Sequence, residues 1–553
     1  MTPKAPGGYW SRLDRLAAWF AARRGWKLYG LMFGFGVGAT LALPPVYAFP
    51  ILYVVFPAML WTLDGAGDGA GDDPGDDAGA GARRWRRSFL TGWWFGFGYF
   101  AASLYWIGNA LLVFAAKHAW LLPFAVIGIP AVLALYAGVA VLIASAGRTA
   151  LARAALLVVA WSGLEWVRGR AFTGFPWNLI GQSWTGSDAM AQSAALFGVY
   201  GLSFSVMASV CAVAMAAYQA RRVRWVAVAV AVALPLLAWG GGAVRLVAAP
   251  DAPGTAIDGA GFRIVQANIP QREKWDPKFR NRNLRRHLDL SMADRPAWVT
   301  HVIWPEMAAT FYVEDDLETR RILSRAAPPG GLLITGAPRR DAAGLHNSAI
   351  AIDGAGTVVG VYDKFHLVPF GEYVPFRNLL RISKISHGVG GYSPGPGPRT
   401  LRLPGLPPVS PLICYEVIFP GAVTDHRNNA AWLLNLTNDA WYGATAGPHQ
   451  HLAISRIRAI EEGAPMVRAA YTGISAVIDS YGRILHRIGL NQAGVIDARL
   501  PPALPINAGP INAGLGRTVY ARFGDGLFVV FLVLGLAVAA FAHRLKTGEG
   551  VRF

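Results

Sequence analysis

Long runs of apolar residues fill the first part of the chain, and one more lies near its C-terminus. They cover residues 28–45, 47–63, 89–115, 119–146, 152–168, 193–217, 225–248 and 526–542. A helix needs about 20 apolar residues to cross the hydrocarbon core of a bilayer. The pattern therefore predicts a polytopic α-helical membrane bundle of about eight spanning helices.

Between the seventh and eighth runs, short apolar segments alternate with amphipathic ones. The predicted strands are 262–268, 301–305, 332–336, 348–352, 358–362, 409–414, 432–437, 469–479 and 483–487, and the predicted helices are 277–293, 315–326, 418–428 and 448–462. Such alternation is typical of an α/β layered domain. We therefore divide the chain into a bundle at 1–248, an α/β domain at 249–520, and a last membrane helix with its tail at 521–553.

The composition favours a membrane protein over a nucleic-acid-binding one. Hydrophobic residues make up 54% of the chain and charged residues only 15%, whereas soluble domains average about 25% charged residues. The net charge of +18 comes from short basic clusters beside the apolar runs. No motif that recognises a nucleic-acid groove accompanies this charge, so we expect no nucleic-acid partner.

The basic clusters also predict an orientation, because Lys and Arg collect in the cytoplasmic loops of membrane proteins. If the N-terminus is cytoplasmic, alternation of the spans places the clusters at 83–87, 148–153 and 221–224 on the same side, together with the tail at 544–546. The α/β domain must then lie on the opposite side of the membrane.

Two loops in the first half have distinct compositions. Residues 64–82 consist largely of Gly, Ala and Asp, which predicts a disordered linker. Residues 172–178 are aromatic and rich in turn formers, and two interpretations stay open: a belt at the membrane interface, or a wall over an active site. Glu165 and Arg168 lie three residues apart before this loop, which predicts an ion pair.

Three chemically reactive side chains each follow an apolar strand of the α/β domain: Glu306, Lys364 and Cys414. Taken singly, they could be a helix-capping acid, a surface lysine and a small buried thiol. Strand ends are also where α/β domains build their sites, and together the three predict one nucleophilic site. The only other cysteine, Cys211, lies inside an apolar run and is no plausible disulfide partner.

The motifs around these residues resemble the carbon–nitrogen hydrolase (nitrilase) superfamily. They are Trp-Pro-Glu at 304–306, Tyr-Asp-Lys-Phe-His-Leu-Val-Pro-Phe-Gly-Glu-Tyr at 362–373 and Ile-Cys-Tyr-Glu at 413–416. This resemblance implies a Glu-Lys-Cys triad on an α-β-β-α sandwich. Together with the membrane bundle, the segments 266–276, 435–443 and 447–451 are similar to the apolipoprotein N-acyltransferase family.

That family transfers an acyl chain from a phospholipid to the N-terminal amine of a diacylglyceryl-modified apolipoprotein, in the last step of lipoprotein maturation. The resemblance implies a bacterial inner-membrane enzyme whose catalytic domain is periplasmic. It assigns catalysis to Glu306, Lys364 and Cys414, and substrate binding or support of the site to Trp275, Glu372, Tyr415 and Glu416. We expect a monomer that needs no cofactor and no metal.

These residue types suit a two-step transfer through a thioester, with ping-pong kinetics. Glu306 is the expected base, while the Lys364 ammonium and the Tyr415 N–H would stabilise the oxyanion. A nearby cation is also expected to favour the Cys414 thiolate. The Gly- and Ser-containing segment 381–392 predicts a movable flap. Two alternatives stay open: a membrane-tethered hydrolase that uses water as the acceptor, and a non-enzymatic scaffold.

Overall fold

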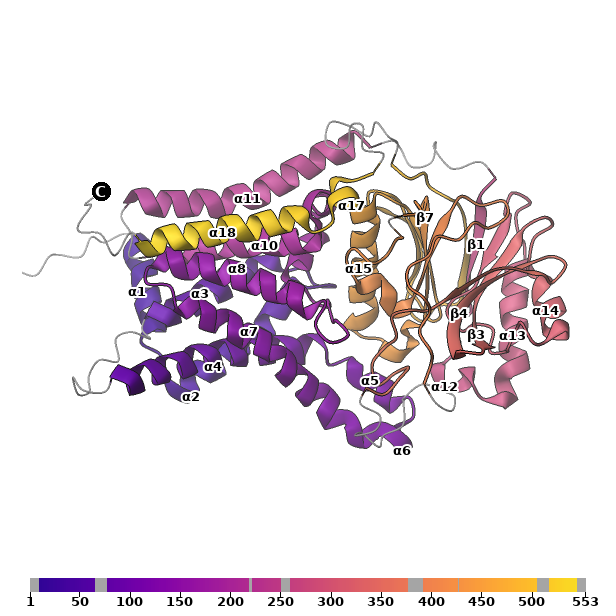
Figure 1. The fold of residues 1–553 in the computed structure, drawn as a ribbon, viewed down its shortest axis with the longest axis horizontal. Helices are drawn as coiled ribbons and strands as arrows, with labels where there is room; N and C mark the ends of the chain where they lie inside the picture. The colour runs from indigo at the N-terminus through magenta and orange to yellow at the C-terminus, as the bar shows by residue number, and fades with distance from the viewer. Residues whose placement is uncertain are drawn as a thin grey trace, which may run out of the picture. The chain divides into compact units, whose positions relative to one another are not determined.

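The computed structural model describes residues 9–64, 77–217, 221–249, 259–375, 391–425, 427–504 and 517–544. The chain forms two compact units (Figure 1). The first comprises Met1–Tyr105, Pro123–Val244 and Phe523–Phe553, and the second comprises Trp106–Leu122 and Arg245–Arg522. A short segment from the N-terminal half therefore folds with the second unit.

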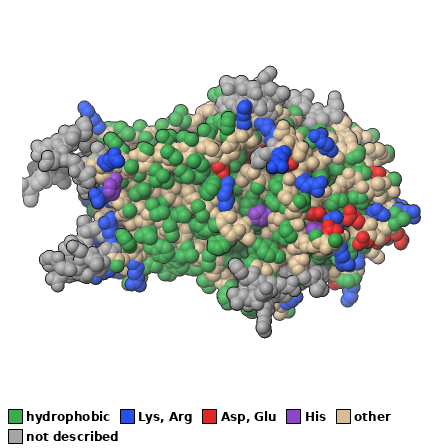
Figure 2. Space-filling model, viewed as in Figure 1, with side chains coloured by type: hydrophobic (Ala, Val, Ile, Leu, Met, Phe, Trp, Pro, Cys, Tyr) green, Lys and Arg blue, Asp and Glu red, His purple; other side chains and the backbone are tan. Residues whose placement is uncertain are grey.

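The first unit is a helix bundle. Its main helices are α1 (Tyr9–Ala21), α2 (Gly25–Ala39), α3 (Leu52–Asp64), α4 (Asp77–Ser103), α7 (Ile129–Ser145), α8 (Ala150–Arg168), α10 (Ala194–Ala214), α11 (Arg221–Val247) and α18 (Gly526–Arg544). Helix α8 packs against α7, α10 and α18, and α4 packs against α2 and α7. Figure 2 shows an apolar surface over these helices, with Lys and Arg side chains at one end.

Within the described ranges, five helical segments are long and apolar enough to cross a membrane: Ala115–Ser145, Ala150–Arg168, Ala194–Ala214, Arg221–Val247 and Gly526–Arg544. The predicted number of eight is not confirmed. Helix α2 has 15 residues, which at 1.5 Å per residue is shorter than the hydrocarbon core of about 30 Å. The apolar segment Phe49–Asp64 is likewise too short.

Helix α4 begins inside the predicted disordered linker at 64–82. Residues 77–82 are helical, which contradicts the prediction for that part, and residues 65–76 lie outside the described ranges. The helix continues through the basic cluster at 83–87 into the apolar run that follows. The sequence pattern missed its start because that stretch has no apolar face.

Glycines allow α2 and α4 to pack with their backbones in close contact. A Cβ atom added at Gly36 would lie 2.0 Å from the carbonyl oxygen of Phe95, and one added at Gly98 would lie 2.2 Å from that of Phe33. Small residues of this kind let membrane helices approach closely and gain van der Waals contact. The packing of α2 on α4 therefore requires glycine at these positions.

The aromatic loop at 172–178 belongs largely to the interior of the bundle. Trp177 is 1% exposed, which does not fit a belt at the membrane interface, although Phe172 is 98% exposed. Glu165 Oε1 accepts hydrogen bonds from Ile180 N at 2.9 Å and from Trp161 Nε1 at 3.2 Å. This carboxylate thus holds the residues that follow the loop against α8.

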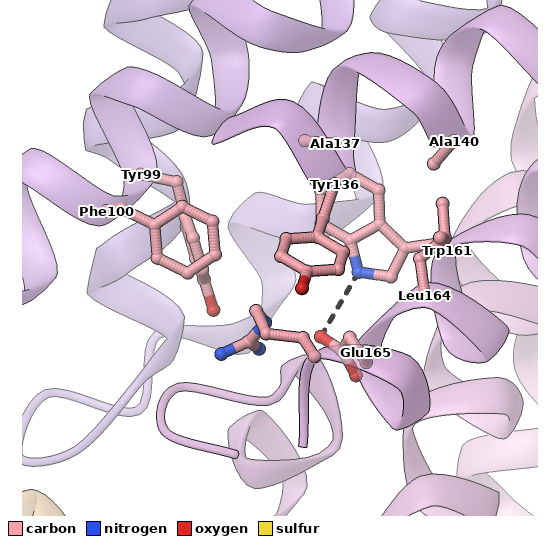
Figure 3. A pocket seen from close by; sticks show the side chains of 9 residues that line it. Tyr99, Phe100, Tyr136, Ala137, Ala140, Trp161, Leu164 and Glu165 are labelled. Atoms are coloured by element: carbon pink, nitrogen blue, oxygen red, sulfur yellow. Dashed lines mark hydrogen bonds between the residues drawn. The ribbon is translucent and has the colours of Figure 1, made fainter. Parts of the chain in front are cut away.

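The predicted ion pair between Glu165 and Arg168 is not formed. Arg168 instead donates to the main-chain oxygens of Phe175 and Trp177, at 2.6 and 2.8 Å. Figure 3 shows Glu165 and its bond to Trp161 at the wall of a cavity of about 20 Å³, which has room for about one water molecule. The local backbone satisfies the guanidinium, so the two side chains have separate partners.

The second unit contains two β-sheets. The six-stranded sheet has the order β11-β1-β2-β3-β4-β5, with β1 (Gly261–Gln266), β2 (His301–Ile303), β3 (Leu332–Asp341), β4 (Gly344–Asp353), β5 (Val358–Asp363) and β11 (Gly494–Arg499). The five-stranded sheet has the order β10-β9-β8-β7-β6, with β6 (Val409–Ile413), β7 (Trp432–Thr437), β8 (Met466–Ala470), β9 (Ser475–Ile478) and β10 (Ile484–Ile488). Strands β1, β2 and β3 run parallel, as do β6, β7 and β8.

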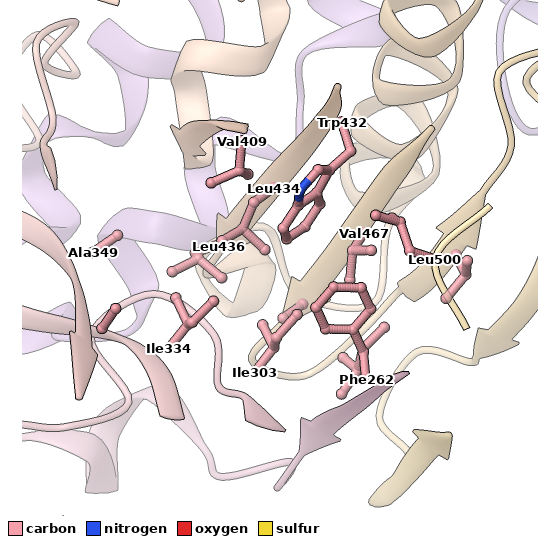
Figure 4. Packing of buried hydrophobic residues seen from close by; sticks show 14 of the residues in the cluster. Phe262, Ile303, Ile334, Ala349, Val409, Trp432, Leu434, Leu436, Val467 and Leu500 are labelled. Atoms are coloured by element: carbon pink, nitrogen blue, oxygen red, sulfur yellow. The ribbon is translucent and has the colours of Figure 1, made fainter. Parts of the chain in front are cut away.

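Apolar side chains from both sheets meet in one core, as Figure 4 shows. Phe262 and Ile334 come from the first sheet, and Trp432 and Leu434 from the second. A second cluster lies between the six-stranded sheet and the helices α13 (Pro277–Met292) and α14 (Leu317–Ser324). Helix α15 (Ala446–Glu462) packs on β8. The predicted α-β-β-α sandwich is therefore confirmed.

Some predicted elements of this domain differ in the structure. The strand predicted at 469–479 is the pair β8 and β9, because the chain turns at Gly473 with a φ of +99°. Strand β11 was not predicted. The helix predicted at 418–428 is wrong: among its described residues only Ile418 is helical, as the last residue of a 3₁₀ turn. Pro420 and Gly421 explain this, since both interrupt helices.

The glycine contacts between α2 and α4 can be tested by substitution. Gly36→Ala should lower the unfolding free energy by about 1–3 kcal/mol, the usual cost of overpacking. Gly34→Ala on the same helix is the matched control, because an added Cβ there meets nothing within 4 Å. Thermal unfolding in detergent measures both variants. Equal melting temperatures for the two would contradict the close packing of α2 on α4.

Candidate active site

Cys414 lies at a sharp turn directly after β6. The strand is buried throughout, and Cys414 begins a short 3₁₀ turn that spans Cys414–Ile418. Its φ of +52° lies in the left-handed region, which non-glycine residues rarely adopt and which clusters at functional sites. The turn carries the thiol out of the line of the strand.

Glu416 joins the Cys414 turn to the segment that carries Lys364. Its Oε2 accepts from Ile413 N at 2.6 Å, and its Oε1 accepts from Phe365 N at 2.8 Å. The Tyr362 hydroxyl donates to Oε2 at 3.1 Å. Burial raises the pKa of Glu416 to about 7, although these backbone donors and Lys364 oppose that rise. A single carboxylate thus orders the ends of β5 and β6, which belong to different sheets.

Lys364 lies between two carboxylates. Its Nζ is 2.8 Å from Glu372 Oε2 and 3.9 Å from Glu306 Oε1. Asn347 on β4 donates from Nδ2 to both acids, at 2.7 Å to Glu306 Oε1 and 2.9 Å to Glu372 Oε1. Lys364 is 1% exposed and Glu306 is 7% exposed. The structure therefore gathers Glu306, Lys364 and Glu372 into one buried charged cluster.

The protonation of this cluster follows from burial and from the neighbouring charges. Burial opposes the charge of Lys364, but Glu372 and Glu306 outweigh it and raise the pKa of Lys364 above its usual value. Burial and the charge of Glu372 raise the pKa of Glu306, while Lys364 opposes the rise. Lys364 therefore stays an ammonium, and Glu306 is a stronger base than an exposed carboxylate.

The resting state of Cys414 differs from the expectation. Burial and the Glu306 charge raise the pKa of the thiol to about 12, and Lys364 only partly opposes them. The sequence predicted a thiolate favoured by the cation. Because desolvation outweighs the attraction of the ammonium, the thiol is protonated near neutral pH. If this thiol acts as a nucleophile, its proton must leave during attack, and a base has to accept it.

Two of the predicted supporting residues are aromatic. Trp275 packs beside a buried cluster of Met307, Leu367 and Tyr392. Tyr415 lies edge-on to Phe419, with ring centroids 5.1 Å apart. His366 stacks on the same Phe419 ring, with the ring centroids 3.6 Å apart.

Two family models together match most of the chain. The one described as carbon-nitrogen hydrolase matches residues 263–505, and the one described as apolipoprotein N-acyltransferase N-terminal domain matches residues 35–213. An apolipoprotein N-acyltransferase of Rhodopseudomonas palustris is 37% identical, over 96% of this chain and 98% of its own length.

The chain belongs to the apolipoprotein N-acyltransferase family.

Two further members of this family are similar along nearly their whole length. The relative from Bradyrhizobium diazoefficiens is 38% identical over 96% of this chain and 97% of its own. The relative from Caulobacter vibrioides is 38% identical over 97% of this chain and 98% of its own. The resemblance found in the sequence motifs is therefore confirmed.

Two polar residues of this site, Asn347 and Lys274, are not among the residues predicted from the sequence to form it. Asn347 bonds both acids, as described above. Lys274, 1% exposed, donates to the main-chain oxygen of Glu306 at 2.9 Å and lies 3.8 Å from the centre of the Tyr471 ring. Burial lowers the pKa of Lys274 to about 7. The sequence offered one sign of a role for Asn347, because this residue is polar and lies within a buried strand.

Among the described residues, one group has the ligand types and spacing of a metal site: Asp341, His346 and Asp363. These side chains already have partners. His346 Nε2 lies 2.9 Å from Asp341 Oδ1, and Arg339 forms ion pairs with Asp341 and Asp363 at 2.8 and 3.0 Å. The group is therefore an ion-pair network. The predicted flap at 381–392 lies outside the described residues except for Gly391 and Tyr392.

The role of Asn347 gives a pH-dependent prediction. Its hydrogen bond stabilises the charged form of Glu306, so Asn347→Ala should raise the pKa of this acid further. If Glu306 must be unprotonated to act, the acid limb of the pH–activity profile moves to higher pH. The lost donor should also lower the unfolding free energy by about 1–3 kcal/mol.

Asn283→Ala is the control, since Asn283 is also a buried amide but donates to the main-chain oxygen of Glu273. This variant should keep the wild-type pH profile. An unshifted profile for Asn347→Ala, in a folded protein, would rule out its effect on the base.

Proposed function

We propose that this chain transfers an acyl chain from a phospholipid to the N-terminal amine of a diacylglyceryl-modified apolipoprotein. The observation that carries the proposal is the buried cluster of Glu306, Lys364 and Glu372 beside the Cys414 turn, in a member of this family that has membrane-spanning helices. One chain supplies every residue of the cluster, so we propose that a monomer suffices. No step requires a metal or cofactor.

The first step forms a thioester on Cys414. Glu306 accepts the thiol proton while Sγ attacks the ester carbonyl of the phospholipid. The Lys364 ammonium and the Tyr415 N–H stabilise the oxyanion of the tetrahedral intermediate. The C–O bond to the glycerol oxygen then breaks, and Glu306 returns the proton to that oxygen. The products are a lysophospholipid and acyl-Cys414.

The second step releases the acyl chain to the lipoprotein. The unprotonated α-amine attacks the thioester carbonyl, and Glu306 accepts a proton from the attacking nitrogen. The C–S bond breaks, an amide is formed, and the proton passes to the departing sulfur. Cys414 is then a thiol again, and the enzyme follows a ping-pong cycle.

A membrane-tethered hydrolase would use the same cluster with water as the acceptor. Two observations favour an amine acceptor and lipid substrates instead. Cys414 is only 6% exposed, and water exclusion protects a thioester from hydrolysis. Trp275 and the neighbouring cluster of Met307, Leu367 and Tyr392 offer apolar contacts near Glu306.

We also propose that the protein lies in the bacterial inner membrane with residues 249–520 in the periplasm. Contacts within the bundle support this orientation. Arg87 donates to the main-chain oxygen of Arg23 at 3.0 Å, and Arg224 pairs with Asp14 at 2.9 Å. Basic segments far apart in sequence thus gather at one end of the bundle, as the positive-inside rule requires for one cytoplasmic face.

The reaction can be tested by mass spectrometry of Cys414 after incubation with labelled phospholipid. We expect an acyl adduct that disappears when a diacylglyceryl-cysteine peptide is added, with the label moving to the peptide amine. Cys414→Ala should lose the adduct and all transfer. Cys211→Ala is the control and should retain both. A folded, lipid-supplied wild-type protein without an adduct would contradict the thioester route, and release of free fatty acid would favour the hydrolase.

The orientation can be tested by labelling a new cysteine in a chain that lacks Cys211 and Cys414. Lys278→Cys, at an exposed position of α13, should react with a membrane-impermeant maleimide in intact spheroplasts. Arg148→Cys, between α7 and α8, should react only after the membrane is permeabilised. The reverse pattern would contradict the proposed periplasmic location.

A further inference from the structure

A buried polar network lies next to the peptide that follows Cys414. It consists of Asp439, His451 on α15 and Arg468 on β8, and all three side chains are 0% exposed. Burying several charges in one place is costly unless each is paired and hydrogen-bonded. The steps proposed above give none of these residues a role.

Asp439 is ionised and accepts hydrogen bonds. Burial raises its pKa, but the charges of His451 and Arg468 hold it below the usual value. Arg468 donates to Asp439 Oδ2 at 2.5 Å, and the Thr437 hydroxyl donates to Oδ1 at 2.8 Å. His451 Nδ1 lies 2.8 Å from the same Oδ1. Arg468 Nη2 lies 3.2 Å from the same Nδ1 and can only donate, so Nδ1 faces both an acceptor and a donor.

The other ring nitrogen of His451 lies 3.3 Å from the main-chain oxygen of Cys414. This oxygen can only accept, so a hydrogen bond here requires a proton on Nε2. The neutral ring with its proton on Nε2 makes this bond, and Nδ1 is then free to accept from Arg468 Nη2, which lies 3.2 Å away. Burial and the charge of Arg468 hold the pKa of His451 below its usual value, although Asp439 opposes that fall. Asp439 holds the Arg468 guanidinium against Nδ1, which favours the proton on Nε2 and keeps a donor directed at Cys414.

The carbonyl that His451 contacts belongs to the same peptide unit as the N–H of Tyr415. A peptide is planar, and in the trans form its C=O and N–H point in opposite directions. A donor that fixes the oxygen on one side therefore fixes the direction of the N–H on the other. Hydrogen bonding at the oxygen also polarises the unit and strengthens its N–H as a donor.

We propose that Asp439 and His451 orient the Cys414–Tyr415 peptide so that the Tyr415 N–H donates to the oxyanion. The proposal rests on the proposed acyl transfer and makes His451 a positioning residue, since it touches neither substrate nor Sγ in this role. The left-handed backbone conformation at Cys414 needs such support. Its φ of +52° is costly and must be maintained by surrounding contacts.

A purely structural network would have different consequences. If His451 only filled space in the core, its replacement would alter the environment of the thiol and the oxyanion site together. A residue that orients the N–H affects the step in which the oxyanion forms. Replacing such a residue leaves the rate of simple thiol alkylation unchanged, because alkylation develops no oxyanion. The two rates therefore separate the explanations.

The test measures two rates on purified full-length protein in nanodiscs that contain phospholipid. One is thioester formation on Cys414, followed by mass spectrometry, and the other is alkylation of Cys414 by iodoacetamide. His451→Leu should slow thioester formation by about 10²–10³-fold, the usual cost of losing one oxyanion donor. Its alkylation rate should match that of the wild type. His451→Gln, whose amide can donate to the same oxygen, should recover most of the acylation rate.

His301 supplies matched controls. It is also a buried histidine, and its Nε2 also lies 3.3 Å from a main-chain oxygen, that of Pro404. His301→Leu and His301→Gln should leave the ratio of the two rates at the wild-type value.

Three outcomes would overturn the inference. The first is an acylation rate in His451→Leu equal to that of the wild type. The second is a parallel loss of the acylation and alkylation rates in that variant. The third is a folded His451→Gln variant whose thiol is alkylated at the normal rate but acylated as slowly as in His451→Leu. Absence of the thioester in the wild type would instead refute the proposed reaction, on which this inference rests.

Discussion

The geometry of the site depends on one buried carboxylate, that of Glu416. It accepts hydrogen bonds from the ends of two strands that belong to different sheets, β5 before Lys364 and β6 before Cys414. An unpaired carboxylate in this position would cost several kcal/mol, because its charge is removed from water. The backbone N–H groups offset that cost only when both strand ends are in place. The ammonium and the thiol are therefore positioned together.

The charges around Lys364 determine how the thiol can act. Two carboxylates share one ammonium, and Asn347 donates to both acids. In this environment the resting thiol is protonated, so the attack that we propose must be accompanied by proton transfer to a base, for which we propose Glu306. A protonated, buried thiol is also less prone to oxidation than a thiolate. That property suits a free cysteine.

Different interactions stabilise the helix bundle and the sandwich domain. In the bundle, the close packing of α2 on α4 depends on glycines rather than on the hydrophobic effect. In the sandwich, a core of large apolar side chains from both sheets, such as Phe262 and Trp432, holds the layers together. Apolar content alone cannot distinguish a spanning helix from a shorter buried one, which explains why the predicted eight spans were not confirmed.

The sequence by itself determined the family, the sandwich, and the polar residues that end its strands. Apolar periodicity and the segments around Glu306, Lys364 and Cys414 are local properties, so they can be recognised without coordinates. The tertiary structure alone decided which side chains meet. Asn347 bonds Glu306 and Glu372, and His451 contacts the Cys414 carbonyl, across separations of 41, 25 and 37 residues. It also decided the protonation of the thiol, because desolvation depends on everything packed around an atom, and no short stretch of sequence records that.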